Sequence, residues 1–206
     1  MFVDTREHVL ESLARGCMAR FIPRNAAVVR AEEPSNFAYL ILSGSMNVLV
    51  SDEDGREAIL STLGPHDLVG EMGILDEGVR SANVIAATPS VVIAITRADF
   101  MRCMRDNADV AFYIMRNLSL RLRIANRKIE SLALMDVAGR VARLLREMAE
   151  ARGGEQDVAR KCSNQEIAKM VGASQEMVSR VLKNLALTRV VATSGGRAGL
   201  LEVNRS

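Results

Sequence analysis

The chain has 206 residues, enough for one large domain or two modest ones, and a net charge of +2. Three dispersed cysteines, Cys17, Cys103 and Cys162, argue against a disulfide framework and favour a reducing, cytoplasmic location. With two histidines, no C-x-x-C pair, no apolar run of about 18 residues and no secretory leader, we expect neither a metal centre nor a membrane contact.

The first 107 residues predict a short helix followed by a β-rich domain. Residues 5–18 can form the helix, with Thr5 as its N-cap. From residue 21 to 95, short apolar runs alternate with turn-forming residues, a spacing typical of a β-sandwich or barrel. The expected strands are Ala26–Val29, Tyr39–Leu42, Met46–Val50, Ala58–Leu63, Asn83–Ala87 and Val91–Ile95. Gly55, which follows three acidic residues, is expected in a hairpin turn between two strands.

Residues 70–82 (GEMGILDEGVRSA) interrupt this rhythm of strands and turns. They combine two glycines around Glu71, a short helical stretch, and Arg80-Ser81 just before the next strand. Backbone N–H groups, an arginine fork and a serine hydroxyl suit a phosphate, and a carboxylate can accept a hydrogen bond from a ribose hydroxyl. The segment therefore indicates a site for a phosphate-bearing ligand. The alternative is a loop in which Glu71 and Arg80 pair with each other.

Residues 108–134 predict one long helix with a heptad repeat. The apolar residues of the repeat are Met115, Leu122 and Ile129 at position a, and Ala111, Leu118, Ala125 and Leu132 at position d. A narrow apolar seam on a helix that otherwise carries arginines is typical of a helix that pairs with its own copy. We therefore expect a homodimer, in which this helix also joins two domains. The alternative is an amphipathic helix that packs on its own domain.

The remaining residues predict small helices followed by two strands. Asp136 can cap a helix over 137–151, which Gly153-Gly154 would end, and a short extended piece follows around 157–161. The basic residues concentrate in this part of the chain. Residues 136–206 carry 12 Lys and Arg against 8 Asp and Glu, whereas residues 1–135 carry 15 against 17. This asymmetry favours a polyanionic partner for the C-terminal part.

Within that part, two short helices flank a glycine turn, the pattern of a helix-turn-helix. Ser163 and Glu166 form a capping box before a helix over 167–171, Gly172 makes the turn, and Ser174 caps a helix over 175–187. Strands over Val190–Thr193 and Leu200–Val203 would form a wing. The candidates for contact with double-stranded DNA are Ser174, Gln175, Glu176, Ser179, Arg180 and Lys183. The alternative is a small helical subdomain with solvated charges.

With these pieces in place, the sequence resembles the cyclic-AMP receptor protein and fumarate–nitrate regulator family of bacterial transcription factors. The resemblance runs from about Arg20 to Val203 and is strongest over residues 39–64, 70–82, 132–145 and 164–185. It implies an α+β fold with an N-terminal β-roll that binds a cyclic nucleotide, a long dimerisation helix and a C-terminal winged helix-turn-helix. The three domains would span 1–107, 108–135 and 136–206, and RNA polymerase would be a partner.

The resemblance also assigns ligand-binding residues. Glu71 matches the ribose-binding glutamate, with Gly70 beside it, and Arg80-Ser81 match the phosphate-binding pair. Arg121 matches an arginine of the dimer helix near the pocket. The family's cyclic-AMP sensors carry Thr-Ser on this helix to read adenine, whereas this chain has Ala125-Asn126. A further departure is Glu32, where the family usually turns on glycine.

Ala125 cannot hydrogen-bond a base, whereas Asn126 offers both a donor and an acceptor and suits adenine or guanine. Cyclic AMP remains the expected effector. The alternatives are cyclic-di-GMP, cyclic GMP, haem, a redox signal, or no ligand at all. An enzyme acting on cyclic nucleotides would need metal-binding acids and histidines or a nucleophile–base pair, so we expect no catalytic activity.

The DNA-contacting residues point to a different branch of the family. The pattern Glu176-x-x-Ser179-Arg180 is similar to the fumarate–nitrate regulators, which read TTGAT-type half-sites. The cyclic-AMP receptor protein has arginine in place of Gln175 and glycine in place of Ser179, and reads TGTGA. We therefore predict a palindromic operator with TTGA-like half-sites.

Overall fold

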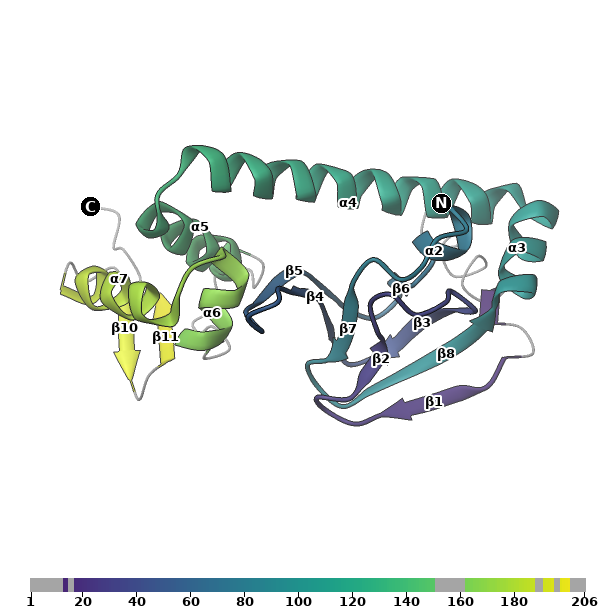
Figure 1. The fold of residues 1–206 in the computed structure, drawn as a ribbon, viewed down its shortest axis with the longest axis horizontal. Helices are drawn as coiled ribbons and strands as arrows, with labels where there is room; N and C mark the ends of the chain where they lie inside the picture. The colour runs from purple at the N-terminus through teal and green to yellow at the C-terminus, as the bar shows by residue number, and fades with distance from the viewer. Residues whose placement is uncertain (1–12, 15–16, 151–161, 188–190, 195–196, 201–206) are drawn as a thin grey trace. The chain divides into compact units, whose positions relative to one another are not determined.

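The computed structural model describes residues 13–14, 17–150, 162–187, 191–194 and 197–200 (Figure 1). It divides into two compact units, residues 1–124 and 125–206, and the long helix α4 (Ala108–Leu134) continues across the boundary. In the described part of the chain, no helix has the length and apolar character needed to span a bilayer. The predicted helix over 5–18 and the extended piece over 157–161 lie largely or wholly outside the described residues.

Two four-stranded antiparallel sheets form the first unit, with strand orders β1-β8-β3-β6 and β2-β7-β4-β5. The strands are β1 (Ala19–Ile22), β2 (Ala27–Val29), β3 (Phe37–Ser43), β4 (Met46–Ser51), β5 (Glu57–Leu63), β6 (Leu68–Val69), β7 (Asn83–Ala86) and β8 (Ser90–Thr96). All the strands predicted from the sequence for this unit are present. The sequence did not indicate β1 or β6, because a short exposed edge strand and a two-residue strand show no clear alternation.

The turn between β4 and β5 forms where the sequence predicts it. Gly55 adopts a left-handed conformation (φ +75°), which a residue without a Cβ reaches without strain. Its N–H donates to the carbonyl of Asp52 (3.0 Å), and Arg56 binds the Asp52 carboxylate (2.7 Å). The local sequence is therefore sufficient to close this hairpin.

Strand β3 is buried on both faces, since alternate residues enter two different hydrophobic clusters. Ile41 packs inside the roll with Met46, Val84 and Val92. Leu40 faces the other way, toward a cluster that includes Phe100 of α3 (Arg97–Asp106) and Ile114 of α4. Burial of such a side chain stabilises the fold by about 1.5–3 kcal/mol. Helix α3, which begins after its N-cap Thr96, was not predicted from the sequence.

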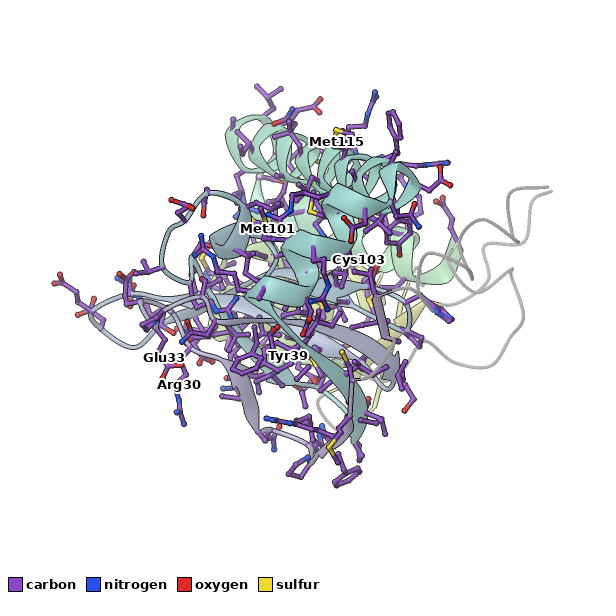
Figure 2. All side chains as sticks on the ribbon, turned by 90° about the vertical axis from the view of Figure 1, so that its right-hand side faces the viewer. Arg30, Glu33, Tyr39, Met101, Cys103 and Met115 are labelled. Atoms are coloured by element: carbon purple, nitrogen blue, oxygen red, sulfur yellow. The ribbon has the colours of Figure 1, made fainter. Side chains whose placement is uncertain are left out.

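Helix α4 uses two faces differently. Val110 and Ile114 are buried against the first unit's core, so one face packs on its own domain. The residues at position a remain exposed: Met115 at 50%, Leu122 at 61% and Ile129 at 63%. Figure 2 shows Met115 on α4, on the side away from the strands. The helix thus packs on its own domain through one face, as the alternative predicted, and the apolar residues at position a of the heptad repeat stay exposed.

After the end of α4, the second unit contains three helices and a small antiparallel sheet among its described residues. Its elements are α5 (Val137–Glu150), β9 (Cys162–Ser163), α6 (Asn164–Val171), α7 (Gln175–Leu187), β10 (Val191–Ser194) and β11 (Arg197–Leu200). As predicted, Ser163 and Glu166 form a capping box, and Gly172 ends α6 in a left-handed conformation. Val141 of α5, Ile167 of α6 and Leu182 of α7 share one core, which holds the helix-turn-helix on α5.

The wing differs from its prediction in the position of its second strand. Ser194 pairs directly with Arg197, and Val191 pairs with Leu200, so the described strand Arg197–Leu200 begins three residues before the predicted start at Leu200. The rest of the predicted strand, residues 201–203, lies outside the described residues. Pairing begins at Arg197, a residue that the apolar pattern had assigned to the turn. The same strand also pairs with Cys162 and Ser163, which places β11 in the middle of the sheet.

Candidate functional site

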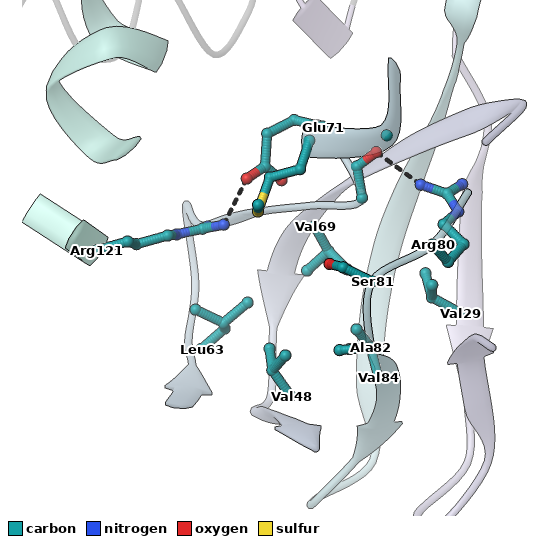
Figure 3. Close-up of a pocket in the computed structure, with 13 residues that line it drawn as sticks. Val29, Val48, Leu63, Val69, Glu71, Arg80, Ser81, Ala82, Val84 and Arg121 are labelled. Atoms are coloured by element: carbon teal, nitrogen blue, oxygen red, sulfur yellow. Dashed lines mark hydrogen bonds and ion pairs between the residues drawn. The ribbon is translucent and has the colours of Figure 1, made fainter. Parts of the chain in front are cut away.

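A pocket that is partly open to solvent lies in the first unit (Figure 3). Its apolar wall comes from the roll and consists of Val29, Val48, Leu63, Val69, Ala82 and Val84. Its polar side brings together five of the residues predicted as ligand-binding, namely Gly70, Glu71, Arg80, Ser81 and Arg121. An apolar wall with a few converging polar groups is the usual character of a small-molecule site.

Glu71 is 2% exposed and lies just before α2 (Met72–Leu75). Its Oε1 accepts a hydrogen bond from Nη1 of Arg121 (2.6 Å), and Nη2 of Arg121 also donates to the carbonyl of Leu68. The other carboxylate oxygen, Oε2, is buried and has no hydrogen-bond partner among the described residues. Buried polar atoms nearly always have a partner, so this oxygen is an acceptor available to a ligand.

Arg80 is 6% exposed and is held by backbone carbonyls rather than by Glu71. Nη1 donates to Gly70 (2.6 Å) and Nη2 donates to Phe37. The alternative of a Glu71–Arg80 pair is therefore wrong: the ion pair of Glu71 is with Arg121. Two of the five N–H donors of the guanidinium are used in these bonds, which leaves three for an anion.

The backbone around Arg80 explains two unusual positions. Gly70 has φ +78°, and a Cβ there would lie 2.3 Å from Nη1 of Arg80, so a side chain would displace the guanidinium. Glu32 has φ +66°, the left-handed conformation for which the family uses glycine. Its N–H donates to the carbonyl of Arg80 (2.9 Å), and the N–H of Arg80 donates to Glu33 (3.0 Å). The turn thus fixes the Arg80 backbone.

Helix α7 presents polar residues on the side opposite to its buried Val178 and Leu182. Of the DNA-contacting residues predicted on this helix, Ser179 is half-buried. The other four are exposed, namely Gln175, Glu176, Arg180 and Lys183. Glu176 and Arg180 form an exposed pair (3.3 Å). Ser174 accepts a hydrogen bond from the N–H of Met177 (3.2 Å), so its hydroxyl caps the helix as predicted.

Comparison with known proteins adds to this geometry. Residues 19–107 match the family model of the cyclic nucleotide-binding domain, and residues 139–205 match that of the Crp-like helix-turn-helix domain. The cAMP-activated global transcriptional regulator CRP of Pasteurella multocida is 34% identical over 190 residues, which cover 90% of this chain and 91% of that protein. The chain belongs to the cyclic-AMP receptor protein and fumarate–nitrate regulator family.

Two other members show similar coverage. The cAMP-activated global transcriptional regulator Vfr of Pseudomonas aeruginosa is 33% identical over 193 residues, with 90% of each chain covered. The structure of the c-di-GMP responsive global regulator CLP of Xanthomonas campestris matches with a TM-score of 0.86 at 26% identity, over 96% of this chain and all of that one. The protein is accordingly a transcription regulator with a cyclic-nucleotide-binding domain and a DNA-binding helix-turn-helix, and not an enzyme.

Several site features had no signal in the sequence. The carbonyls of Phe37 and Leu68 hold the two arginines, and a backbone carbonyl belongs to every residue type. Asn126 is exposed on α4 within the second unit, and its contact with a ligand base stays a prediction.

Proposed function

We propose that this regulator is a cytoplasmic homodimer whose affinity for DNA is set by cyclic AMP. The observation that carries the proposal is the unpartnered, buried Oε2 of Glu71 in the same pocket as Arg80 and Ser81. A ribose hydroxyl can donate to that oxygen, while the remaining donors of Arg80 and the Ser81 hydroxyl can bind a cyclic phosphate. The cAMP-activated regulators at 33–34% identity support the same effector.

Each proposed ligand residue has a distinct role. Gly70 allows the close approach of Arg80, and Arg121 orients the Glu71 carboxylate so that one oxygen stays available. Asn126 of the partner subunit would read the base in place of the hydrogen-bonding pair that the family's cyclic-AMP sensors carry. Ala125 itself offers no hydrogen bond to the base.

A second effector, cyclic-di-GMP, has support of its own. The c-di-GMP responsive regulator CLP of Xanthomonas campestris has a structure that superposes on nearly the whole chain. Ala125 also removes one of the two groups with which the family's cyclic-AMP sensors read adenine. The likeness to CLP favours cyclic-di-GMP over cyclic GMP or a redox signal. The loss of the base-reading group at Ala125 is equally compatible with activity without any ligand.

Calorimetric titration of the purified protein with cyclic AMP, cyclic GMP and cyclic-di-GMP tests the effector. Operator binding is then measured with each nucleotide, because only a ligand that binds two states differently can shift their populations. We expect cyclic AMP to bind and to tighten operator binding. Binding of cyclic-di-GMP alone would favour the second effector, and operator binding that ignores all three nucleotides would favour a constitutively active protein.

We expect Glu71→Gln to weaken cyclic AMP binding without lowering the unfolding temperature at neutral pH. Burial raises the pKa of Glu71 above its usual 4.5, although the charges of Arg121 and Arg80 act in the opposite direction. A carboxyl with a raised folded-state pKa stabilises the fold fully below its unfolded pKa, and this contribution is lost as pH rises through the folded pKa. Glutamine is neutral at every pH in this range and so mimics the protonated carboxyl. The variant therefore does not lose this stability as pH rises.

Thermal unfolding of wild type and Glu71→Gln between about pH 4.5 and 7.5 measures the effect. The unfolding temperature of the variant relative to wild type should rise with pH. Its loss of affinity should be smaller for 2′-deoxy cyclic AMP, which lacks the hydroxyl that Glu71 serves. A variant that unfolds well below wild type at neutral pH would show that the ionised carboxylate stabilises the fold.

The homodimer predicts a strong effect of Leu122→Glu. Leu122 lies in the exposed seam with Met115 and Ile129, and a glutamate there would place two like charges in the buried interface of the dimer. We expect the free energy of dimerisation to become less favourable by about 2 kcal/mol or more, which raises the dimer dissociation constant by roughly 30-fold or more. Leu120→Glu is the matched control, because Leu120 is 50% exposed on α4 but lies off the heptad seam.

Analytical ultracentrifugation of both variants measures the dissociation constant. Equal dimerisation by Leu122→Glu and Leu120→Glu would place the interface elsewhere on the protein.

The proposed operator is a palindrome of TTGA-like half-sites about one helical turn apart, to match a two-fold dimer. RNA polymerase is the proposed partner at such promoters.

A further inference from the structure

Arg140 joins three backbone segments of the second unit. It lies in the first turns of α5, where Asp136 accepts hydrogen bonds from the N–H of Gly139 (2.8 Å) and, through its carbonyl, from the N–H of Arg140 (3.0 Å). These bonds fix where the Arg140 side chain leaves the helix. The backbone that carries the guanidinium is therefore held in a fixed position.

The guanidinium donates to three carbonyl oxygens outside α5. Nη1 donates to Met135 (3.0 Å), Nε donates to Val171 (3.0 Å), and Nη2 is 3.5 Å from the carbonyl of Gly172. Met135 directly follows α4, while Val171 and Gly172 end α6. The last carbonyls of a helix lack partners within the helix and carry partial negative charge. One permanently charged side chain thus caps the ends of two helices.

The α6–α7 turn also lies against α4. A Cβ on Gly172 would come within 3.4 Å of Cδ2 of Leu132, in the last turn of α4. Recognition helix α7 begins a few residues later, after Ala173 bonds back to the carbonyl of Ala168 (3.1 Å). The end of α4 and the start of α7 are therefore connected through one turn, by the Leu132 contact and by Arg140.

We propose that Arg140 is a positioning residue that fixes the direction of α7 relative to the end of α4. This inference rests on the proposed homodimer, in which the α4 helices define the two-fold axis and Arg140 would set the separation of the two recognition helices. The planar guanidinium can bind several carbonyls in fixed directions, whereas a lysine ammonium is a point charge on a flexible stem. A residue that only stabilised helix ends would not affect which operator spacing fits.

The test compares two palindromic operators, one with matched half-site spacing and one with a single base pair inserted between the half-sites. Arg140→Lys and Arg140→Gln are compared with wild type and with Arg143→Gln. Arg143 is the matched control, because it lies one turn further along α5 and its Nε bonds to Glu147 of the same helix (2.9 Å). Affinity for a single half-site is measured in parallel, as a readout of an intact recognition helix.

Wild type and Arg143→Gln should prefer the matched spacing on the order of 100-fold, because misplaced half-sites prevent simultaneous binding by a rigid dimer. The preference of both Arg140 variants should fall to about 10-fold or less, with single half-site affinity within about twofold of wild type. Arg140→Lys retains the positive charge at both helix ends, so it keeps the test valid where Arg140→Gln unfolds.

Arg140 variants that fold and keep the wild-type spacing preference would overturn the positioning role. A proportionate loss of affinity for every DNA, including the single half-site, would also overturn it and assign Arg140 a purely structural role. A wild-type protein with no spacing preference would instead refute the proposed dimer on its operator, and this inference with it.

Discussion

Arg80→Ala is expected to weaken cyclic AMP binding by about 2–5 kcal/mol, or roughly 30-fold to a few thousand-fold. The side chain is buried, and the carbonyls of Gly70 and Phe37 fix it in place before any ligand arrives. A preorganised charge loses little entropy on binding, and the pocket's apolar wall strengthens its attraction for a phosphate. Its removal leaves the phosphate without the preorganised charge that Arg80 supplies at the pocket.

The same substitution also removes a partner from two carbonyls, so stability has to be measured separately. Arg97→Ala is the matched control, because Arg97 belongs to the same unit and pairs with Glu77 (2.8 Å) at the surface, away from the pocket. Gly70→Ala offers an independent route, since a Cβ would displace Nη1 of Arg80 while the arginine itself remains. Calorimetric titration measures the affinity of each folded variant for cyclic AMP. If the folded Arg80→Ala protein binds cyclic AMP as tightly as wild type does, the phosphate-binding role of Arg80 is refuted.

Arg180→Ala is expected to cost about 1–3 kcal/mol of operator affinity and to relax the preference for guanine at one position of each half-site. Its guanidinium can bind O6 and N7 of guanine together, whereas Glu176, one turn earlier, can accept from N4 of cytosine. The pair that these two side chains form is exposed at 72% and 85%, and exposed ion pairs contribute at most about 1 kcal/mol. Loss of that pair therefore does not account for the expected effect.

Two further variants separate base reading from charge. Arg180→Lys keeps the positive charge but loses the planar fork, so it should relax the guanine preference nearly as much as alanine does. Lys183→Ala, if Lys183 meets a phosphate, should weaken all sequences alike and lower the salt dependence by about one counterion. Selection from random DNA measures the guanine preference, and operator titrations at several salt concentrations measure the effect of Lys183→Ala. Strong enrichment of TGTGA over TTGA by the wild-type protein would refute the proposed half-site.

The sequence alone determined features that depend on neighbouring residues. The capping box of Ser163 and Glu166, the glycine turn at 172 and the hairpin at Gly55 each form within a few residues, and each has the structure that its sequence predicts. Six of the eight strands of the roll and the full length of α4 follow from hydrophobic periodicity, which depends only on the order of apolar and polar residues. The start of the second wing strand, at Arg197 instead of Leu200, was wrong in the prediction because weak alternation leaves register to strand pairing.

Only the tertiary structure decided which partners the polar residues of the pocket have. Glu71 is 50 residues from Arg121, and the choice of this arginine over Arg80 depends on how α4 packs against the roll. Arg80 and Arg140 are held by backbone carbonyls, which every residue carries and no sequence motif can mark. The unpartnered Oε2 of Glu71 likewise follows from burial, because an exposed carboxylate of the same sequence would be satisfied by water.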